Sequence, residues 1–143
     1  MSVSEYLFVY GSLRRNADGE LHPLLQNSAE FMHSASIPGL LFDVGDYPGV
    51  IYTPPEKPFR VQGEIYRIHA PEVLLAILDE YEECNANFPA PHEYRRCRIA
   101  VDLSADQTLP AWVYLYNRPI SGLKWIASGD YVEFWQTAAL LRE

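Results

Sequence analysis

Tyr6-Leu7-Phe8-Val9-Tyr10 is a short, nearly continuous apolar run near the start of the chain, and Gly11 ends it. Such a run is typical of a strand that is buried on both faces. We therefore expect a strand over residues 6–10, followed directly by a turn at Gly11-Ser12-Leu13.

Most of the remaining chain also has strand character. Residues 94–103 and 111–116 are rich in aromatic and β-branched side chains, which favour strands, and residues 60–68 alternate between apolar and polar types. Shorter strands are expected over residues 29–37, 40–44 and 50–52, separated by turns at Pro38-Gly39 and Tyr47-Pro48-Gly49.

Helical segments are few. The clearest one begins at Pro71, a residue type that is favoured in the first helical turn. Its apolar positions recur at helical spacing, at Val73, Leu74, Ile77, Leu78 and Tyr81. A second amphipathic stretch near residues 130–141 predicts another helix, and residues 20–26 favour one or two helical turns.

This order of elements predicts the fold class. Strands dominate, and the crossover helices that a parallel, doubly wound sheet needs are missing. We expect an α+β fold, with a small, mainly antiparallel, β-barrel-like sheet and a few flanking short helices. A length of 143 residues is typical of one domain, so residues 1–143 are expected to form a single domain.

The composition argues against several classes of protein. The formal net charge is −8, whereas binding to nucleic acid needs a face rich in Lys and Arg. Arg95, Arg96 and Arg98 form a local basic patch, but strand alternation splits it between two faces. No apolar run is long enough for a membrane span, and the N-terminus lacks the pattern of a signal peptide. We expect a cytoplasmic protein with no nucleic-acid or membrane partner.

Metal binding is not expected either. The chain has two cysteines, Cys84 and Cys97, whereas a structural zinc site needs four ligands. Its four histidines lack the spacing of metal ligands. We expect both cysteines to be free thiols.

The turn after the first strand is the first candidate site. Glycine permits unusual backbone angles, so the consecutive N–H groups of Gly11, Ser12 and Leu13 can turn inward and bind an anion. The alternative is an ordinary Gly-Ser turn after a strand.

The acidic end of the first predicted helix is the second candidate site, with the sequence Asp79-Glu80-Tyr81-Glu82-Glu83. Its four carboxylates oppose the helix dipole, and such departures from good helix design often mark functional sites. Helical spacing puts Glu82 near Leu78 and Asp79, at the edge of the buried face. Apolar neighbours and the charge of Asp79 would raise the pKa of Glu82, as a general base requires. The alternative is a solvated helix end.

Glu64, within Gly63-Glu64-Ile65-Tyr66, is a third candidate. It could be a second active-site carboxylate, but on an alternating strand it could equally face solvent.

Taken together and in order, these motifs resemble the γ-glutamyl cyclotransferase family, including its plant avirulence-induced and bacterial members. The matching positions extend along nearly the whole chain: Tyr10-Gly11-Ser12-Leu13, Pro38-Gly39-Leu40, Tyr47-Pro48-Gly49, Val61-Gln62-Gly63-Glu64-Ile65-Tyr66, Leu78-Asp79-Glu80-Tyr81-Glu82, Tyr94-Arg95-Arg96, Ala111-Trp112-Val113-Tyr114 and Ser128-Gly129-Asp130-Tyr131. Each motif is weak alone, but the ordered series is specific.

The resemblance implies a β-barrel-like core with flanking helices, and an amine-releasing transferase or lyase. In the implied reaction, the α-amino group of a small γ-glutamyl substrate attacks its own side-chain carbonyl. The products are 5-oxoproline and a released amine or amino acid. The resemblance also implies that Tyr10, Gly11, Ser12 and Leu13 bind the α-carboxylate and that Glu82 is the catalytic acid/base. It implies no metal and no organic cofactor.

Other interpretations remain open. Residues 84–92 look longer and more proline-rich than the family's minimal loop, and they directly follow Glu82, so they are a candidate for the element that selects the leaving group. A non-catalytic binding module of the same fold, which senses a small amino-acid-like ligand, is the alternative to an enzyme. A third reading is a protein-interaction domain that uses Trp125 and Trp135, although we expect these two residues in the core or in a pocket wall.

Overall fold

The computed structural model describes residues 4–16, 18–104 and 106–141 of the chain. Its elements, in chain order, are β1 (Glu5–Val9), β2 (Ala29–Asp43), β3 (Pro48–Tyr52), β4 (Arg60–Ile68), α1 (Pro71–Tyr81), β5 (Tyr94–Ser104), β6 (Gln107–Tyr116), β7 (Lys124–Trp125) and α2 (Tyr131–Leu141). The predicted strand over residues 60–68 and the helix that begins at Pro71 are confirmed. Residues 23–28 form turns and not a regular helix, although the Gln26 N–H donates to the carbonyl of His22.

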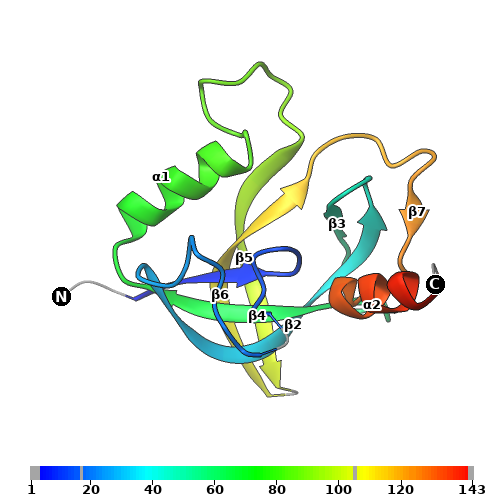
Figure 1. Ribbon diagram of the computed structural model, residues 1–143, viewed down its shortest axis with the longest axis horizontal. Helices are drawn as coiled ribbons and strands as arrows, with labels where there is room; N and C mark the ends of the chain where they lie inside the picture. Colours follow the sequence, from blue (N-terminus) through cyan, green and yellow to red (C-terminus); the bar gives the residue numbers. More distant parts are fainter. Residues whose placement is uncertain (1–3, 17, 105, 142–143) are drawn as a thin grey trace.

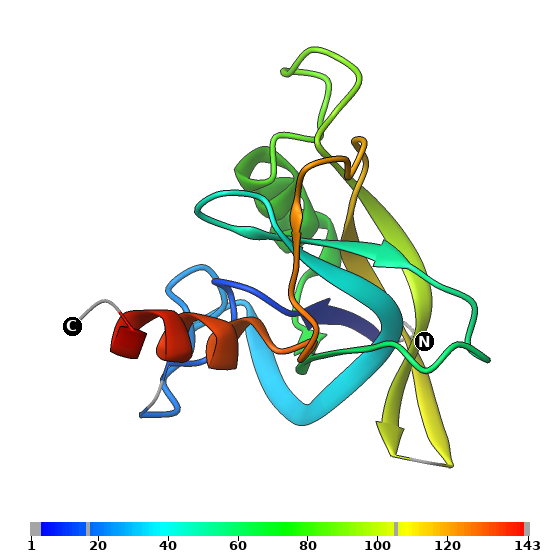
Figure 2. The same ribbon diagram turned by 90° about the vertical axis from the view of Figure 1, so that its right-hand side faces the viewer.

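Five strands form a closed barrel (Figures 1 and 2), in the order β2-β4-β1-β6-β5. A pairing of Ser36 in β2 with Asp102 in β5 completes the ring. Neighbouring strands are antiparallel except β1 and β6, which run parallel where Leu7 faces Trp112. The short strands β3 and β7 pair with the last part of β2. The predicted α+β class, with a small, mainly antiparallel barrel and short flanking helices, is confirmed.

The sequence prediction was wrong about Pro38-Gly39, which lies inside the long, strongly curved strand β2 (Figure 2). At these two residues β2 changes partner, since Pro38 is paired with β4 and Gly39 with β3. A Cβ on Gly39 would lie 3.0 Å from the Ile51 carbonyl oxygen, a tight contact, so close strand packing favours glycine here. Likewise, Pro48 and Gly49 already belong to β3, and the turn before it is closed by the Val44 N–H bonding to the Tyr47 carbonyl.

The core has two layers, and β1 contributes to both, as its continuous apolar run predicts. Phe8 packs inside the barrel with buried residues such as Ile37, Val61 and Val113. Leu7 and Val9 point the other way and pack under α1, in a second buried cluster. The strand therefore ends between the barrel and α1, and the residues that follow it emerge there.

The two helices of the described chain lie on opposite sides of the barrel (Figure 1). The buried face of α1 is formed by Leu74, Leu75 and Leu78. Of the predicted apolar positions, Val73, Ile77 and Tyr81 are exposed, because the helix packs on the barrel with a rotated face that includes Leu75, a residue outside the predicted set. Neither helix is long and apolar enough to cross a membrane, within the part of the chain that is described.

The two tryptophans have different environments. Trp125 is 48% exposed and stands edge-on to Phe59, so it does not lie in the core, but it lines a second, smaller pocket, which agrees with the pocket-wall alternative. Trp135 lies partly buried against the barrel core, as predicted.

Candidate active site

A cavity of about 310 Å³ lies where β1, α1, β5 and β6 meet. Its wall contains all five residues that the sequence singled out for substrate binding and catalysis: Tyr10, Gly11, Ser12, Leu13 and Glu82. The first four directly follow β1, and Glu82 directly follows α1 as its C-cap, about 70 residues later in the chain. The topology that places β1 beneath α1 brings these two segments together.

The 11–13 turn, Gly11-Ser12-Leu13, forms one side of the cavity. The Arg14 N–H donates to the Gly11 carbonyl at 3.0 Å and closes the turn. Leu13 is buried in the core, whereas Ser12 is exposed, with its Oγ 3.5 Å from Tyr81 Oη. The N–H groups of the 11–13 turn have no acceptor among the described residues. They are therefore free to bind an anion in the cavity.

Gly11 is required for a different reason from the one that the sequence suggested. It is not among the described residues with positive φ. A Cβ at this position would lie 2.7 Å from Cγ of Pro48, a distance that real Cβ atoms do not tolerate. Glycine is needed because the turn packs directly against the start of β3.

Glu82 is the residue that ends α1. The helix closes with two hydrogen bonds, from Glu83 N–H to the Glu80 carbonyl at 3.1 Å and from Cys84 N–H to the Asp79 carbonyl at 2.9 Å. This pattern is a Schellman motif, which requires a left-handed residue directly after the cap and usually has glycine there. Glu83 occupies that position with φ of 56°. The backbone strain lies next to the candidate catalytic residue, as is common at functional sites.

The Glu82 carboxylate is partly buried and has no hydrogen bond or ion pair with any described residue. Burial raises its pKa from 4.5 to about 7, and the negative charge of Glu93 adds to the shift. An unpaired carboxylate with a pKa near neutral can both accept and donate a proton at physiological pH.

The charge of Asp79 is not a cause of the raised pKa of Glu82, so one of the two expected causes was wrong, whereas burial is the larger cause of the shift. The Asp79 carboxylate is bound by Arg96 through two hydrogen bonds of 2.9 and 3.2 Å and by the Tyr114 hydroxyl at 2.6 Å. Arg96 in turn lies over the ring of Trp112. Asp79 therefore anchors the end of α1 to β5 and β6, and of the basic patch on β5 only Arg96 serves this structural purpose among the described contacts.

Glu93, Tyr47, Tyr94 and Tyr114 complete the cavity, and the sequence analysis assigned none of them to the site. The Tyr47 hydroxyl donates to both carboxylate oxygens of Glu93, at 2.9 and 3.0 Å. The Tyr10 hydroxyl donates to the Tyr114 carbonyl and the Tyr94 hydroxyl to the Pro48 carbonyl. Burial and nearby carboxylates, Glu82 among them, raise the pKa of Tyr10 and Tyr94 well above the usual range, so both stay protonated.

The charges in the cavity divide it into two chemically different sides. Glu82, Glu83 and Glu93 give one side a negative potential, which attracts a cation. The free N–H groups of the 11–13 turn give the other side donors for an anion. Together they suit a small molecule that carries an ammonium and a carboxylate.

Glu64 lies outside this cavity and does not face solvent, so neither of the two expectations for it holds. It is 5% exposed, and Oε1 accepts hydrogen bonds from the Arg15 N–H at 2.9 Å and the Tyr66 hydroxyl at 2.8 Å. Its Oε2 lies 3.8 Å from Nε of Arg14 and 3.5 Å from Nε of Arg15. Glu64 is a buried, paired carboxylate behind the turn.

The loop of residues 84–92 also stays away from the cavity. Glu83 and Glu93, at its two ends, line the cavity, but none of the described residues 84–92 does. Both cysteines are free thiols, and the described residues contain no group of three or more His, Cys, Asp or Glu side chains that could hold a metal ion.

Known proteins resemble this chain along most of its length. The family model for γ-glutamyl cyclotransferase, AIG2-like, matches residues 7–133. The γ-glutamylcyclotransferase family protein YtfP of Escherichia coli K12 is 35% identical over 128 residues, which cover 89% of this chain and 96% of that protein.

Solved structures give the same picture. The solution structure of E. coli YtfP has a TM-score of 0.61 and 32% identity, with 90% of this chain and 97% of that chain covered. The crystal structure of YkqA from Bacillus subtilis has a TM-score of 0.70 and 25% identity over 96% of this chain. This chain spans 43% of that longer protein. Because the family model and the YtfP relative each extend over most of the chain, this protein belongs to the γ-glutamyl cyclotransferase family.

Proposed function

We propose that this protein is a γ-glutamyl cyclotransferase-type enzyme. The α-amine of a small γ-glutamyl compound attacks its own γ-carbonyl, and the products are 5-oxoproline and a released amine or amino acid. The observation that carries the proposal is the position of Glu82, an unpaired carboxylate with a pKa of about 7, in one cavity with the free N–H groups of the 11–13 turn.

The two sides of the cavity match the two charged groups of such a substrate. The 11–13 turn would accept the α-carboxylate through its backbone N–H groups. The α-ammonium would then lie toward the acidic side, near Glu82. Once both groups are held, the γ-carbonyl is the only electrophile within reach of the amine, and the attack is intramolecular. Holding the reacting groups in this way supplies a large part of the rate enhancement.

Glu82 would move the protons. In its ionised form it takes a proton from the α-ammonium, which leaves the free amine to form the new C–N bond with the γ-carbon. The protonated carboxyl then delivers that proton to the departing nitrogen as the old amide C–N bond breaks. The regenerated carboxylate accepts the second proton, which the ring nitrogen must lose to become the lactam N–H, and this proton leaves with the released amine as its ammonium form. One group can serve both steps because its pKa of about 7 keeps both protonation states populated at neutral pH.

The test is an assay of 5-oxoproline with purified protein and a panel of γ-glutamyl compounds that differ in the released amine. The parent protein is expected to convert at least one of them, and Glu82→Gln to lose about 10²- to 10⁴-fold in rate, as is typical for a general acid/base. Glu80→Gln, on the same helix but outside the cavity wall, is the matched control and is expected to keep the parent rate.

The same panel separates the enzyme from a binding module of the same fold. Binding of γ-glutamyl compounds with no 5-oxoproline from any of them, in the parent and in Glu82→Gln alike, would favour the binding module and contradict the proposal.

A further inference from the structure

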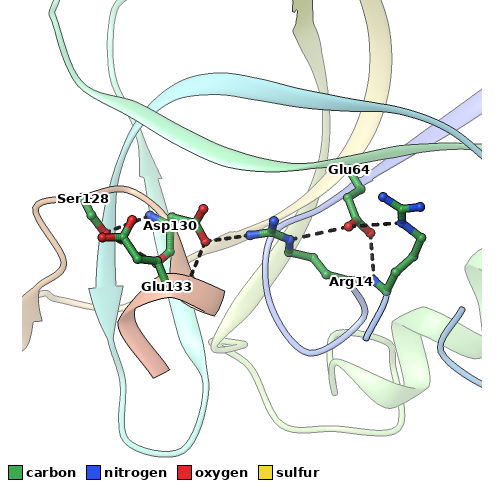
Figure 3. Close-up of polar contacts among 6 residues, drawn as sticks. Arg14, Glu64, Ser128, Asp130 and Glu133 are labelled. Carbon is green, nitrogen blue, oxygen red and sulfur yellow. Dashed lines mark hydrogen bonds and ion pairs between the residues drawn. The ribbon is translucent and has the colours of Figure 1, made fainter. Parts of the chain in front are cut away.

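A chain of paired charges connects the 11–13 turn with the start of α2 (Figure 3). Arg14, the residue directly after the turn, lies between two carboxylates. Its Nη1 donates to Asp130 Oδ1 at 3.0 Å, and its Nε lies 3.8 Å from Glu64 Oε2. The side chains of Arg14 and Glu64 are 16% and 6% exposed, and neither is among the described residues that line the cavity. The cluster therefore supports the turn from behind.

Both carboxylates that hold Arg14 are themselves fixed by regular structure. Glu64 belongs to β4, and it also accepts the hydroxyl proton of Tyr66. Asp130 is the residue before α2, and its Oδ1 accepts the Glu133 N–H at 3.1 Å, as an N-cap does. Its own N–H donates to Ser128 Oγ at 3.2 Å. Arg14 is thus held between two elements that are far apart in the sequence.

The backbone of the turn is tied to the same cluster. Glu64 Oε1 accepts the N–H of Arg15, two residues after the turn, at 2.9 Å. The guanidinium of Arg15 lies 3.6 Å above the ring of Phe31, which fixes this side chain as well. Backbone donors bind an anion best when they are held in place before the ligand arrives.

We propose that Arg14 is a positioning residue for substrate recognition. Held between Glu64 and Asp130, it fixes the 11–13 turn in the conformation that binds the substrate's α-carboxylate. This role rests on the proposed function and concerns affinity for that carboxylate, whereas Glu82 governs the proton transfers. Loss of Arg14 is therefore expected to weaken the binding of substrates that carry the α-carboxylate and to leave the rate of the chemical step unchanged.

The test compares two substrates that release the same amine. One is a γ-glutamyl amide, and the other is the matching 4-aminobutyryl amide, which lacks only the α-carboxylate and cyclises to 2-pyrrolidinone. Arg14→Met keeps the apolar stem of the side chain and leaves Glu64 bonded to Arg15 and Tyr66. It is expected to raise KM for the γ-glutamyl amide by about 10- to 100-fold. The kcat for this amide, and kcat/KM for the 4-aminobutyryl amide, should change by less than about threefold.

Two further variants sharpen this test. Asp130→Asn preserves the N-cap, because Asn is as good a cap as Asp, but it removes the charge that faces Arg14. KM for the γ-glutamyl amide is expected to rise in this variant too, but by less than in Arg14→Met. Arg67→Met is the control. It removes an arginine that forms an exposed ion pair with Glu30, and it is expected to leave KM and kcat unchanged for both amides.

The outcomes separate a positioning role from a merely structural one. An equal loss for both amides in Arg14→Met would show a general effect on the fold and overturn the proposal, and so would an unchanged KM for the γ-glutamyl amide. A parent protein that forms no 5-oxoproline from any γ-glutamyl compound would instead contradict the proposed function.

Binding of the product tests the positioning role without turnover. In the parent, 5-oxoproline is expected to shift the amide NMR signals of Gly11, Ser12 and Leu13, and 2-pyrrolidinone is expected to leave them unchanged. Arg14→Met should lose the response to 5-oxoproline. A response of unchanged size in Arg14→Met would overturn the proposal, whether or not the protein is an active enzyme.

Discussion

Glu82 and Glu64 are two carboxylates withdrawn from water in the same small protein, and their surroundings are opposite. Glu64 is 5% exposed, accepts two hydrogen bonds, and has two arginines within ion-pair distance. Glu82 is less deeply buried, yet it has no hydrogen bond or ion pair among the described residues and faces the charge of Glu93. Burial alone therefore does not make a carboxylate suited to proton transfer. A buried carboxylate is suited to proton transfer when it also lacks a compensating partner, because its pKa is then raised. A buried carboxylate without a partner lowers the stability of the fold.

The largest stability effect is expected at the paired site. Glu64→Gln keeps an acceptor for the Arg15 N–H and the Tyr66 hydroxyl, but it leaves the partly buried charges of Arg14 and Arg15 without their shared counterion. Breaking a buried ion pair in this way costs about 3–5 kcal/mol, and the lower end is expected because Arg14 keeps Asp130. Urea denaturation at pH 8 measures this change. A variant as stable as the parent would show that the charge of Glu64 is not needed.

The same type of substitution at Glu82, the unpaired carboxylate, is expected to raise the stability of the protein. Because the folded protein binds the Glu82 proton more tightly than the unfolded chain does, stability is lost as the pH rises from about 4.5 to about 7. Glu82→Gln removes this penalty, so at pH 8 it is expected to be more stable than the parent by up to about 3 kcal/mol. At pH 4 the two proteins should be equally stable. A variant that is less stable than the parent at pH 8 would contradict this account of Glu82.

A smaller gain in stability is expected at the strained residue beside Glu82. Glu83→Gly replaces a side chain at φ of 56° with the residue type that this position of a Schellman motif favours. The relief of strain, about 1–3 kcal/mol for a left-handed residue, is partly offset by the conformational entropy of glycine in the unfolded chain. A net gain of about 1 kcal/mol is expected in thermal or urea denaturation. A loss of stability would mean that the Glu83 side chain makes a favourable contribution that outweighs its backbone strain.

Glu93→Gln separates the two causes of the raised pKa of Glu82. Because burial is the larger cause and Glu93 the smaller, the apparent pKa in the pH profile of kcat/KM is expected to move down but to stay above 4.5. The hydroxyl of Tyr47 still has an acceptor in Gln, so the wall of the cavity is preserved. An apparent pKa that does not move would show that Glu93 has no influence on Glu82.

Local patterns were sufficient to predict much of this molecule from its sequence. The continuous apolar run before Gly11, the alternation over residues 60–68 and the proline at the start of α1 each report on their own element, and each was confirmed. Pro38-Gly39 was misread because the same pair that ends a strand at a turn can also mark the point where one long strand changes partner. That change depends on β3 and β4, which are remote in sequence.

The cavity shows the same limit. Glu82 stood out because a carboxylate at the C-terminal end of a helix departs from good helix design, and the 11–13 turn stood out because a glycine directly after a buried strand lets consecutive N–H groups turn inward. Glu93 had no such signal, since its position opposite Glu82 follows from the pairing of β5 with β6 and from the loop before them. The pairing of Glu64 with Arg14 could not be predicted from the sequence either, because the contact joins the residue after the 11–13 turn to β4, about 50 residues later in the chain.

The central claim is that Glu82 changes its protonation state near neutral pH, and an NMR titration of its side-chain carboxyl carbon tests this most directly. Glutamate labelled with ¹³C at the carboxyl carbon, with Glu82→Gln to assign the signal, follows this one group from pH 4 to pH 9. The account predicts a midpoint near pH 7, raised by burial and by Glu93. A midpoint close to the ordinary value of 4.5 would mean that Glu82 is fully ionised at neutral pH, and the proposed acid/base role would be contradicted.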